Sequence, residues 1–512
     1  MKLDALKPLV KLLPEVRKPA RAPPLNEKLM WTVVALILFF VMYHIYPIGV
    51  AVPQSATGNF FELISRGDIV GALSALFGIG GLDFAQMIMA SKMGSLITTG
   101  IGPIILASIF LQLFIGAKII DIDMRDPEQK AVYQGTQKLL ALALCFFEAA
   151  MYTLFIFASG GSGIALHVLF GSLILTEILV IFQLAFGSII LMYADEIVSK
   201  YGIGSGISLF IAAGVSLAVI QGAIGLFLTR AIPALSTGAA DSIPKALLAM
   251  LPLLFTGLVF FASSYAEGMK IEIPLSFERA RGFGGRFPIK FLYVSNIPVI
   301  LASALMINMQ LMTRMLSGII STSWVLGGVG LLDFIARMDS TGRVYGGLIY
   351  FITPSFPNPA IVGYDTYMSV LGGSTELLVP WLGSMLVPEW VHIITYVLFM
   401  VILCVIFGRF WIETTGMGPK DVAEQLQRSG MQLPGYRRDP RIVERVLGKY
   451  IPTITILGSI FVGLLAAFAD LTGALGTGTG ILLTVGILYR MYEDLSTQRM
   501  FEMYPSLKSL VG

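Results

Sequence analysis

The stretch SKMGSLITTGIGPIILASIFLQLFIG, residues 91–116, has the length and apolar character of a membrane-spanning helix, but glycines crowd its first half. Gly100 and Gly102 lie two residues apart, and Pro103 follows them directly. A helix that faces only lipid gains nothing from so much backbone freedom, whereas a helix that packs closely against others, or borders a passage, can use it. The rest of the chain is therefore expected to surround this helix.

A second apolar run, GALSALFGIGGLDFAQMIMA, occupies residues 71–90 and is interrupted by glycines and by Asp83. This pattern predicts a half-helix that enters the membrane and returns. Irregular backbone at that depth is tolerated only inside protein or in a water-filled cavity. In the helix that follows, Ile101 and Ile105 are four residues apart and therefore share one face.

The composition is that of a membrane protein. Of the 512 residues, 56% are hydrophobic and 13% are charged, and the mean hydropathy is +0.81, whereas soluble domains are about one quarter charged. Each span needs roughly 20 apolar residues, so the chain has room for about ten spans and their loops. Cys145 and Cys404 lie in apolar runs, which predicts small core residues and no disulfide framework. The N-terminus lacks the pattern of a cleavable signal.

Apolar runs predict an all-α membrane protein with ten transmembrane helices. Their approximate bounds are 29–52, 91–116, 135–158, 166–193, 204–228, 244–266, 289–312, 391–410, 450–468 and 477–492. Two pseudo-symmetric inverted halves of five helices are expected, with the working site at their interface. The proline-containing region 313–390 is interpreted as an outer loop with partly buried pieces.

The chain divides into four parts on this basis. Residues 1–28 form a basic amphipathic segment expected on the cytoplasmic membrane surface, with a disordered basic tail as the alternative. Residues 29–228 form the N-terminal half with spans one to five, including the re-entrant half-helix at about 71–93. Residues 229–495 form the C-terminal half with spans six to ten, and 496–512 form a cytoplasmic tail.

The loops expected in the cytoplasm are rich in lysine and arginine. Between spans six and seven lie Lys270, Arg279, Arg281, Arg286 and Lys290, and between spans eight and nine lie Lys420, Arg428, Arg437, Arg438, Arg441, Arg445 and Lys449. The longer region 313–390 contains only three arginines. These basic loops either set the topology alone or form a docking surface for a large anionic partner such as ribosomal RNA, since arginine pairs with phosphate in a bidentate way.

The glycine runs GIGSG (residues 202–206) and GTGTG (residues 476–480) are not phosphate-binding loops, because neither ends in Gly-Lys-Ser or Gly-Lys-Thr. They favour close helix packing or a flexible helix start. His44, His167 and His392 are scattered, with no partner at metal-ligand spacing and no Ser-His-Asp grouping. Neither an enzyme, nor a metal site, nor a cofactor is expected.

Two acidic residues fall inside predicted spans, Glu148 in the third and Glu177 in the fourth. An ionisable residue in a membrane is by default a functional candidate, and in a transporter it would bind a proton or an ion. A hydrogen-bonded packing role at a helix interface is the alternative. Two isolated acids do not form a relay, and no basic partner within the membrane is evident.

Branched aliphatic residues recur beside the glycine runs and around Pro298. They are Ile207, Ile211, Ile297, Ile300 and Leu483. Each alone is ordinary core. Together with the isoleucine pair of the second span, they permit a ring of aliphatic side chains that closes a pore and gates it by excluding water.

Longer motifs resemble the SecY family, the channel subunit of the protein-conducting translocon, in its archaeal form. They are GIGPI (100–104) with LQL (111–113), AFGSIILMYADEIVSKYGIGSGISLFIAAG (185–214), FPIKFLYVSNIPVILASAL (287–305), FWIETTGMGPKDVA (410–423) and GALGTGTGILLTVGILYRMYE (473–493). Together, the motifs extend the resemblance over essentially the whole chain.

The resemblance implies an hourglass pore with a plug at about 71–93. The positions that match the family's pore ring are Ile101, Ile105, Ile207, Ile211, Ile297, Ile300 and Leu483. A lateral gate is expected between spans two and three on one side and spans seven and eight on the other. Its polar cluster falls on Glu148 and Asn308, whereas the third polar position, usually a threonine, is Leu106 and departs from the family's pattern.

The resemblance also implies the partners. Ribosome-docking positions match Arg279, Arg281, Arg437 and Arg438. Two small single-span subunits, of the SecE and beta types, are expected to complete a heterotrimer in the plasma membrane, with both chain ends in the cytoplasm. The channel is expected to be passive and driven by the ribosome or another motor. A secondary transporter that binds solute at Asp83 or Glu148 is the alternative from another class, and a membrane-embedded enzyme lacks any catalytic grouping.

Overall fold

The structure is a computed structural model that describes most of the chain. The described residues are 8, 13–17, 19, 23–50, 92–116, 119–120, 126–157, 166–168, 171–236, 242–277, 284–319, 325–326, 329–338, 344–354, 356–357, 359–379, 383–428, 431–432 and 440–503. The predicted plug lies outside them except for Lys92 and Met93. The four predicted docking arginines also lie outside them, namely Arg279, Arg281, Arg437 and Arg438.

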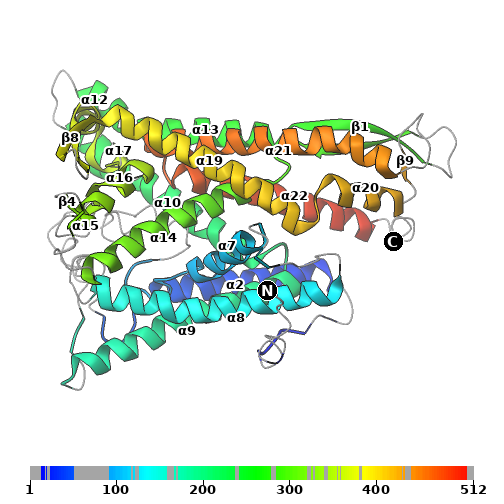
Figure 1. Ribbon diagram of the computed structural model, residues 1–512, viewed down its shortest axis with the longest axis horizontal. Helices are drawn as coiled ribbons and strands as arrows, with labels where there is room; N and C mark the ends of the chain where they lie inside the picture. Colours follow the sequence, from blue (N-terminus) through cyan, green and yellow to red (C-terminus); the bar gives the residue numbers. More distant parts are fainter. Residues whose placement is uncertain are drawn as a thin grey trace.

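Long helices of the first half of the chain follow the predicted spans. They are α2 (Leu25–His44), α7 (Gly102–Gly116), α8 (Pro127–Met151), α9 (Leu173–Tyr201) and α10 (Gly206–Leu226). The π-helical turns η2 (Tyr152–Phe157) and η3 (Phe227–Ala231) continue α8 and α10. In Figure 1, α2, α8 and α9 form one flank of the molecule, and α7 lies between this flank and the centre.

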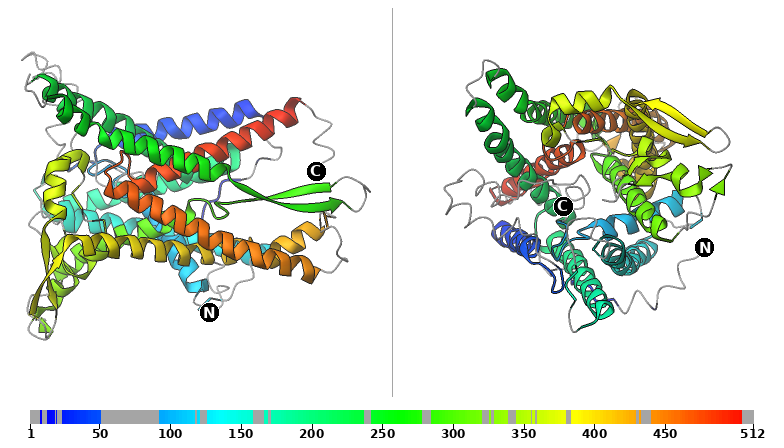
Figure 2. Two further views of the ribbon diagram at one scale, coloured as in Figure 1. Left: turned by 90° about the horizontal axis from the view of Figure 1, so that it is seen from above. Right: turned by 90° about the vertical axis from the view of Figure 1, so that its left-hand side faces the viewer.

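The second half contributes the opposite flank and part of the centre. Its helices are α11 (Ile232–Ser236), α12 (Ser242–Ala249), α13 (Leu251–Gly268), α14 (Ile297–Ile319), α19 (Glu389–Thr415), α20 (Pro419–Arg428), α21 (Pro440–Leu471) and α22 (Gly478–Met503). Helices α13, α19 and α21 form the flank, whereas α14 and α22 lie between the flanks with α10 (Figure 1). Viewed along the long axis, the helices surround a common centre (Figure 2).

The membrane character predicted from hydropathy is confirmed. Among the described residues, seven helices are long and apolar enough to cross a membrane, and α7 and α14 contain shorter apolar helices, Gly102–Ile115 and Ile297–Gln310. The tenth predicted span corresponds to α22. Several predicted bounds are wrong, because charged ends of α9, α21 and α22 continue as helix beyond the apolar runs. The seventh span begins at Ile297, since residues 284–290 form a strand.

Predicted span two is helical only from Gly102. Residues 92–101 form successive turns, in which the Ser95 hydroxyl donates to the carbonyl oxygen of Lys92 (2.7 Å). Gly100 has a φ of 56°, which lies outside the right-handed helical region. Serine and threonine side chains that bond to the backbone compete with helix formation. The prediction of one continuous helix is therefore wrong in its first half.

The turns before α7 are held against α9 by a close backbone approach. A Cβ atom at Gly187 would overlap the carbonyl oxygen of Leu96, so this position has no room for a side chain. Thr99 and Ser188 share a hydrogen bond, and the Ser188 hydroxyl also donates to the carbonyl oxygen of Gly100 (2.9 Å). The entry to α7 is therefore built on α9.

Strands occur outside the membrane helices and were not expected from the sequence. At one end of the molecule, which we call the hairpin end, β1 (Lys270–Phe277) and β2 (Gly284–Lys290) form an antiparallel hairpin, and β9 (Met431–Gln432) pairs with β1. The opposite end, or loop end, holds β3 (Val325–Leu326), β4 (Val329–Gly330), β5 (Arg337–Met338), β6 (Val344–Gly346), β7 (Ser374–Val379) and β8 (Gly383–Pro388). Between these strands lie α15 (Leu331–Ile335), α16 (Leu348–Ile352), α17 (Pro359–Val362) and α18 (Tyr364–Leu371).

Candidate pore and docking face

All of the aliphatic residues predicted for the pore ring lie in one hydrophobic cluster at the centre of the bundle. Four of them are buried, Ile101, Ile105, Ile211 and Leu483, and the other three pack against the cluster while partly exposed, Ile207, Ile297 and Ile300. They come from the turns before α7, from α7, and from the starts of α10, α14 and α22. The fold therefore brings together residues that are far apart in sequence.

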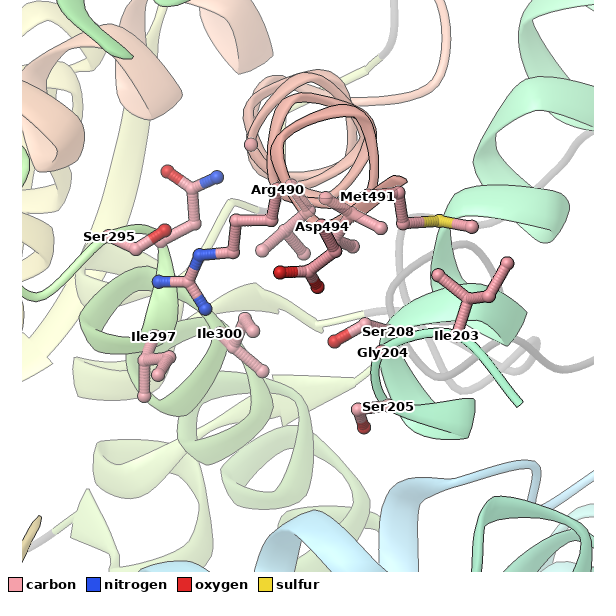
Figure 3. Close-up of a pocket in the computed structure, with 14 residues that line it drawn as sticks. Ile203, Gly204, Ser205, Ser208, Ser295, Ile297, Ile300, Arg490, Met491 and Asp494 are labelled. Carbon is pink, nitrogen blue, oxygen red and sulfur yellow. The ribbon is translucent and has the colours of Figure 1, made fainter. Parts of the chain in front are cut away.

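A cavity of about 190 Å³ opens on the hairpin side of this cluster (Figure 3). Part of its lining is aliphatic, with Ile297, Ile300, Leu483 and Ile487. Ile203 and Met491 add to this apolar part, and the polar part consists of Ser205, Ser208, Ser295, Asn296, Arg490 and Asp494. Three members of the predicted ring thus form part of the wall of a cavity that also holds polar and charged side chains.

The start of α10 is set by Asp195 of α9. Its carboxylate accepts hydrogen bonds from the backbone N–H of Ile207 (2.8 Å) and from the Ser205 hydroxyl (3.2 Å). A carboxylate at this place satisfies N–H groups that the helix leaves free and suits the positive end of its dipole. A Cβ atom at Gly206 would lie 3.0 Å from the Asp195 Oδ1 atom. The GIGSG run therefore serves close packing, as predicted, and fixes Ile207 next to the cavity-lining Ser208.

The start of α22 is also set by a carboxylate of the preceding helix. The Asp470 carboxylate of α21 accepts from the backbone N–H of Gly478 (2.8 Å) and from the Tyr396 hydroxyl of α19 (2.8 Å). A Cβ atom at Gly480 would lie 2.9 Å from the side chain of Val215 on α10. The GTGTG run therefore also serves close packing, and it sets α22 directly on α10.

Polar contacts join α14 to α22. The Asn296 side-chain amide, just before α14, donates to the carbonyl oxygen of Leu482 (2.6 Å). Farther along α14, the Ser303 and Thr479 hydroxyls lie 3.1 Å apart in a buried hydrogen bond. The ring residues on these two helices are therefore held in a fixed register.

The helices of the predicted lateral gate meet mainly at α7. Helix α7 contacts both α14 and α19, and the η2 turn after α8 contacts α14. Glu148 is 3% exposed, and its carboxylate has no hydrogen-bond partner in the described part of the chain. The Asn308 amide donates within its own helix to the carbonyl oxygen of Ala304 (2.9 Å). Leu106 is buried. Within the described residues, Glu148 and Asn308 are thus both buried but not hydrogen-bonded to each other.

Comparison with known proteins decides the family. A model of the SecY family matches residues 95–492. The protein translocase subunit SecY of Methanocaldococcus jannaschii is 39% identical over 514 residues, which is 100% of each chain. The chain belongs to the SecY family. SecY of Pyrococcus furiosus is 38% identical and is matched over 99% of each chain.

Solved SecY-type structures have the same fold. A structure of a protein-conducting channel is 37% identical, has a TM-score of 0.73 and is matched over 98% of each chain. Sec61 in the canine ribosome-channel complex is 36% identical, has a TM-score of 0.71 and is also matched over 98% of each chain. The SecY-family chain described here is therefore a multi-pass membrane protein.

In this SecY-family chain, the two basic loops meet at one sheet. Phe277, the last described residue before segment 278–283, pairs with Met431 of β9. Segment 433–439 follows directly after Gln432, the last residue of β9. The two loops that carry the predicted docking arginines are therefore joined through the pairing of β1 with β9.

Two charged residues of the cavity were not predicted from the sequence. Arg490 and Asp494 point into it from α22 (Figure 3). They follow Leu483 and Ile487 at intervals of three and four residues, which places all four on one helix face. The predicted span ended at residue 492, so Asp494 lay beyond it, whereas Arg490 lay within it but was not predicted as a site residue.

Other singled-out residues have packing roles. Cys145 and Cys404 are buried free thiols, as predicted. The His392 ring stacks on Phe356, with ring centroids 4.0 Å apart, and its Nδ1 atom lies 3.3 Å from the Glu389 carboxylate. Within the described ranges, no group of three or more His, Cys, Asp or Glu side chains could hold a metal ion.

Proposed function

We propose that this chain is the central pore-forming subunit of a protein translocation channel. It passes unfolded secretory polypeptides across the membrane and releases transmembrane segments sideways. The observation that carries this proposal is a cavity, lined by polar and aliphatic side chains, whose wall includes the ring residues of α14 and α22, in a chain of the SecY family. Its relative at 39% identity over the full length is a protein translocase subunit.

Aliphatic side chains suit a seal around a moving polypeptide. They repack around different contours through many weak contacts of about 0.1–0.2 kcal/mol each, and they offer an ion no ligand. In this proposal the constriction consists of Ile101, Ile105, Ile207, Ile211, Ile297, Ile300 and Leu483. The plug, residues 71–93, closes it at rest.

The lateral gate lies between α7 and α8 on one side and α14 and α19 on the other. A signal sequence is an apolar helix, so a sideways opening lets it enter lipid with a gain of about 0.8 kcal/mol per buried methylene. This step needs no nucleotide chemistry, so we propose a passive, non-enzymatic channel whose direction comes from a partner. Glu148 and Asn308 set the balance between closed and open states, since a change of surroundings alters the free energy of buried polar groups, above all that of the Glu148 carboxylate, which has no hydrogen-bond partner in the described part of the chain.

The partners in this proposal are the ribosome, signal sequences and nascent chains, and two small single-span subunits of the SecE and beta types. The hairpin end is the cytoplasmic end, and its basic loops dock the ribosome. A similar chain, Sec61, occurs in the canine ribosome-channel complex at 36% identity. Both chain ends lie in the cytoplasm, and the heterotrimer resides in the plasma membrane.

Crosslinking from a stalled, signal-bearing nascent chain tests the pore and the gate together. A photoreactive probe is stepped along the mature part of the nascent chain and then along its signal. The mature part is expected to crosslink to Ile101, Ile105, Ile207 and Ile211, and the signal to α7 and α14. Absence of crosslinks, with ribosomes unbound, would contradict the proposal and favour solute transport at Glu148.

Charge reversal tests the docking face. Arg281→Glu and Arg437→Glu are expected to weaken ribosome binding and to reduce its salt dependence, by a log–log slope of roughly 0.7–0.9 for each lost phosphate contact. Arg337→Glu is the matched control, because Arg337 pairs with Glu376 at the loop end (3.1 Å). Unchanged ribosome binding at physiological salt would rule out the docking role.

A further inference from the structure

One carboxylate of α22 attaches the base of the hairpin. Lys270 and Lys290 face each other across β1 and β2 as the pair at the base of the hairpin. The Glu493 carboxylate lies 3.5 Å from the Lys270 ammonium and forms a closer ion pair with the Lys290 ammonium. The Lys290 ammonium also lies 5.2 Å from the ring centre of Tyr489, one turn earlier on α22. We call these four residues the hairpin clamp.

Helix α22 carries the hairpin clamp and the cavity lining on adjacent faces. Its cavity-lining residues, from Leu483 to Asp494, recur at intervals of three and four and share one face. Glu493 lies about 100° round the helix from Asp494, and about 15 Å along the axis from Leu483. These residues belong to one unbroken helix. A displacement of the clamped end is therefore transmitted to the ring residue.

The hairpin clamp is weak enough to be reversible. The side chains of Lys270, Lys290 and Glu493 are 36%, 31% and 34% exposed, and ion pairs at such exposure stabilise a protein only slightly. Partial burial raises the pKa of Glu493, but the hydrogen bond from Lys290 and the charges of both lysines outweigh this effect, so its pKa lies below the usual range. Glu493 is therefore charged at neutral pH, and the pairs can shift without a change of protonation.

The other end of the hairpin leads to the docking face. β1 and β2 are paired along their whole described length, from Lys270 and Lys290 to Ser276 and Gly284. β9 fastens the far end of β1 to the second basic loop. Two hydrogen-bonded strands therefore carry a load from the docking segments to the hairpin clamp.

We propose that Glu493 is a positioning residue that couples the docking face to the pore. Ribosome binding at the basic loops displaces the hairpin, the hairpin clamp displaces α22, and Leu483 shifts within the aliphatic ring. This inference rests on the proposed function. Without Glu493, a docked ribosome holds the hairpin but leaves α22 in place.

The test uses Glu493→Gln in the complex as purified, reconstituted into planar bilayers. Ribosome affinity is expected to stay within twofold of the parent protein, while the ribosome-induced rise in ion conductance falls about fivefold. The triple reversal Lys270→Glu, Lys290→Glu and Glu493→Lys rebuilds the pairs with opposite sign and is expected to restore the response. Glu376→Gln breaks the exposed pair with Arg337 at the loop end and, as the matched control, leaves both quantities unchanged.

The outcomes separate this inference from the proposed function. A full conductance response in Glu493→Gln overturns the coupling, and so does a loss of affinity and response together. If the parent protein binds no ribosomes, the docking function fails, and hydrogen exchange without ribosomes decides the inference. In this experiment, Glu493→Gln is expected to raise hydrogen exchange in residues 483–495 and at the hairpin base together. Equal exchange in the parent protein and in Glu493→Gln overturns the inference.

Discussion

Leu483→Ala tests whether the aliphatic ring holds the channel closed. Leu483 is 1% exposed and lines the cavity, whereas its neighbour Leu482 is 0% exposed and is not among the lining residues. Replacing a buried leucine by alanine costs about 2–5 kcal/mol of folding free energy. Because the two side chains are equally buried, Leu483→Ala and Leu482→Ala are expected to lower thermal stability by similar amounts.

The two substitutions are expected to differ in their effect on opening. In the proposed channel, opening breaks the ring contacts of Leu483, so part of the cost of Leu483→Ala is expected to fall on the closed state alone. As little as 1.4 kcal/mol of that loss raises the ratio of open to closed channels about tenfold. Leu482 is not among the residues that line the cavity, so Leu482→Ala is expected to leave the ratio unchanged.

Ion flux from proteoliposomes, with thermal unfolding measured in parallel, compares the two variants. Resting leak is expected to rise about tenfold for Leu483→Ala and to match the parent protein for Leu482→Ala. Equal leak in both variants would mean that lost stability alone opens the channel. If Leu483→Ala is destabilised by several kcal/mol but its resting ion leak does not rise, the ring residues are ordinary core.

Three further predictions concern stability. Glu148→Leu should raise the unfolding free energy by about 1–3 kcal/mol in detergent melts, because it removes a buried carboxylate that lacks a hydrogen bond in the described part of the chain; a loss of stability would reveal a partner. Gly187→Ala should prevent folding, because its Cβ atom would overlap Leu96. Gly257→Ala is the control, since its Cβ atom meets nothing within 4 Å, and it should stabilise α13 by up to about 1 kcal/mol. Equal melting temperatures of the two variants would contradict this prediction. The lowered pKa of Glu493 means that its contribution is complete above the unfolded pKa of about 4.3 and is lost as the pH falls through the folded pKa. Melts of the parent protein and Glu493→Gln should therefore converge in acid, and a difference that grows there would refute the ion pairs.

Much of the membrane architecture could be predicted because lipid imposes a local rule. Each span must be apolar over about 20 residues, and that property can be found without knowing any contact. The rule gave wrong helix bounds where hydrogen bonding determines the backbone conformation. The seventh span was predicted to begin at residue 289, yet residues 284–290 form a strand that pairs with β1. Residues 92–101 are apolar enough for a span, yet Gly100 and the serine and threonine side chains favour turns.

The candidate ring stays a prediction, although its residues lie in one cluster, and its polar surroundings were not predicted. Isoleucines at helical spacing beside glycine runs were visible in the sequence, and their placement on α10 and α14 agrees with that pattern. Arg490 lay within the sequence motif, but only the packing of α22 against α10 and α14 places it in the cavity. Glu493 is the last residue of a family motif, and only the hairpin places two lysines beside it.

By itself the sequence determined the class of protein, the order of its membrane helices and the family, because hydropathy and motifs are properties of neighbouring residues. Only the tertiary structure decided that ring residues from the turns before α7 and from α10, α14 and α22 meet in one cluster, and that Glu493 joins the hairpin to α22. The physical reason is distance along the chain. Burial can be predicted from a residue and its neighbours, but the partner that it meets depends on how separate helices pack.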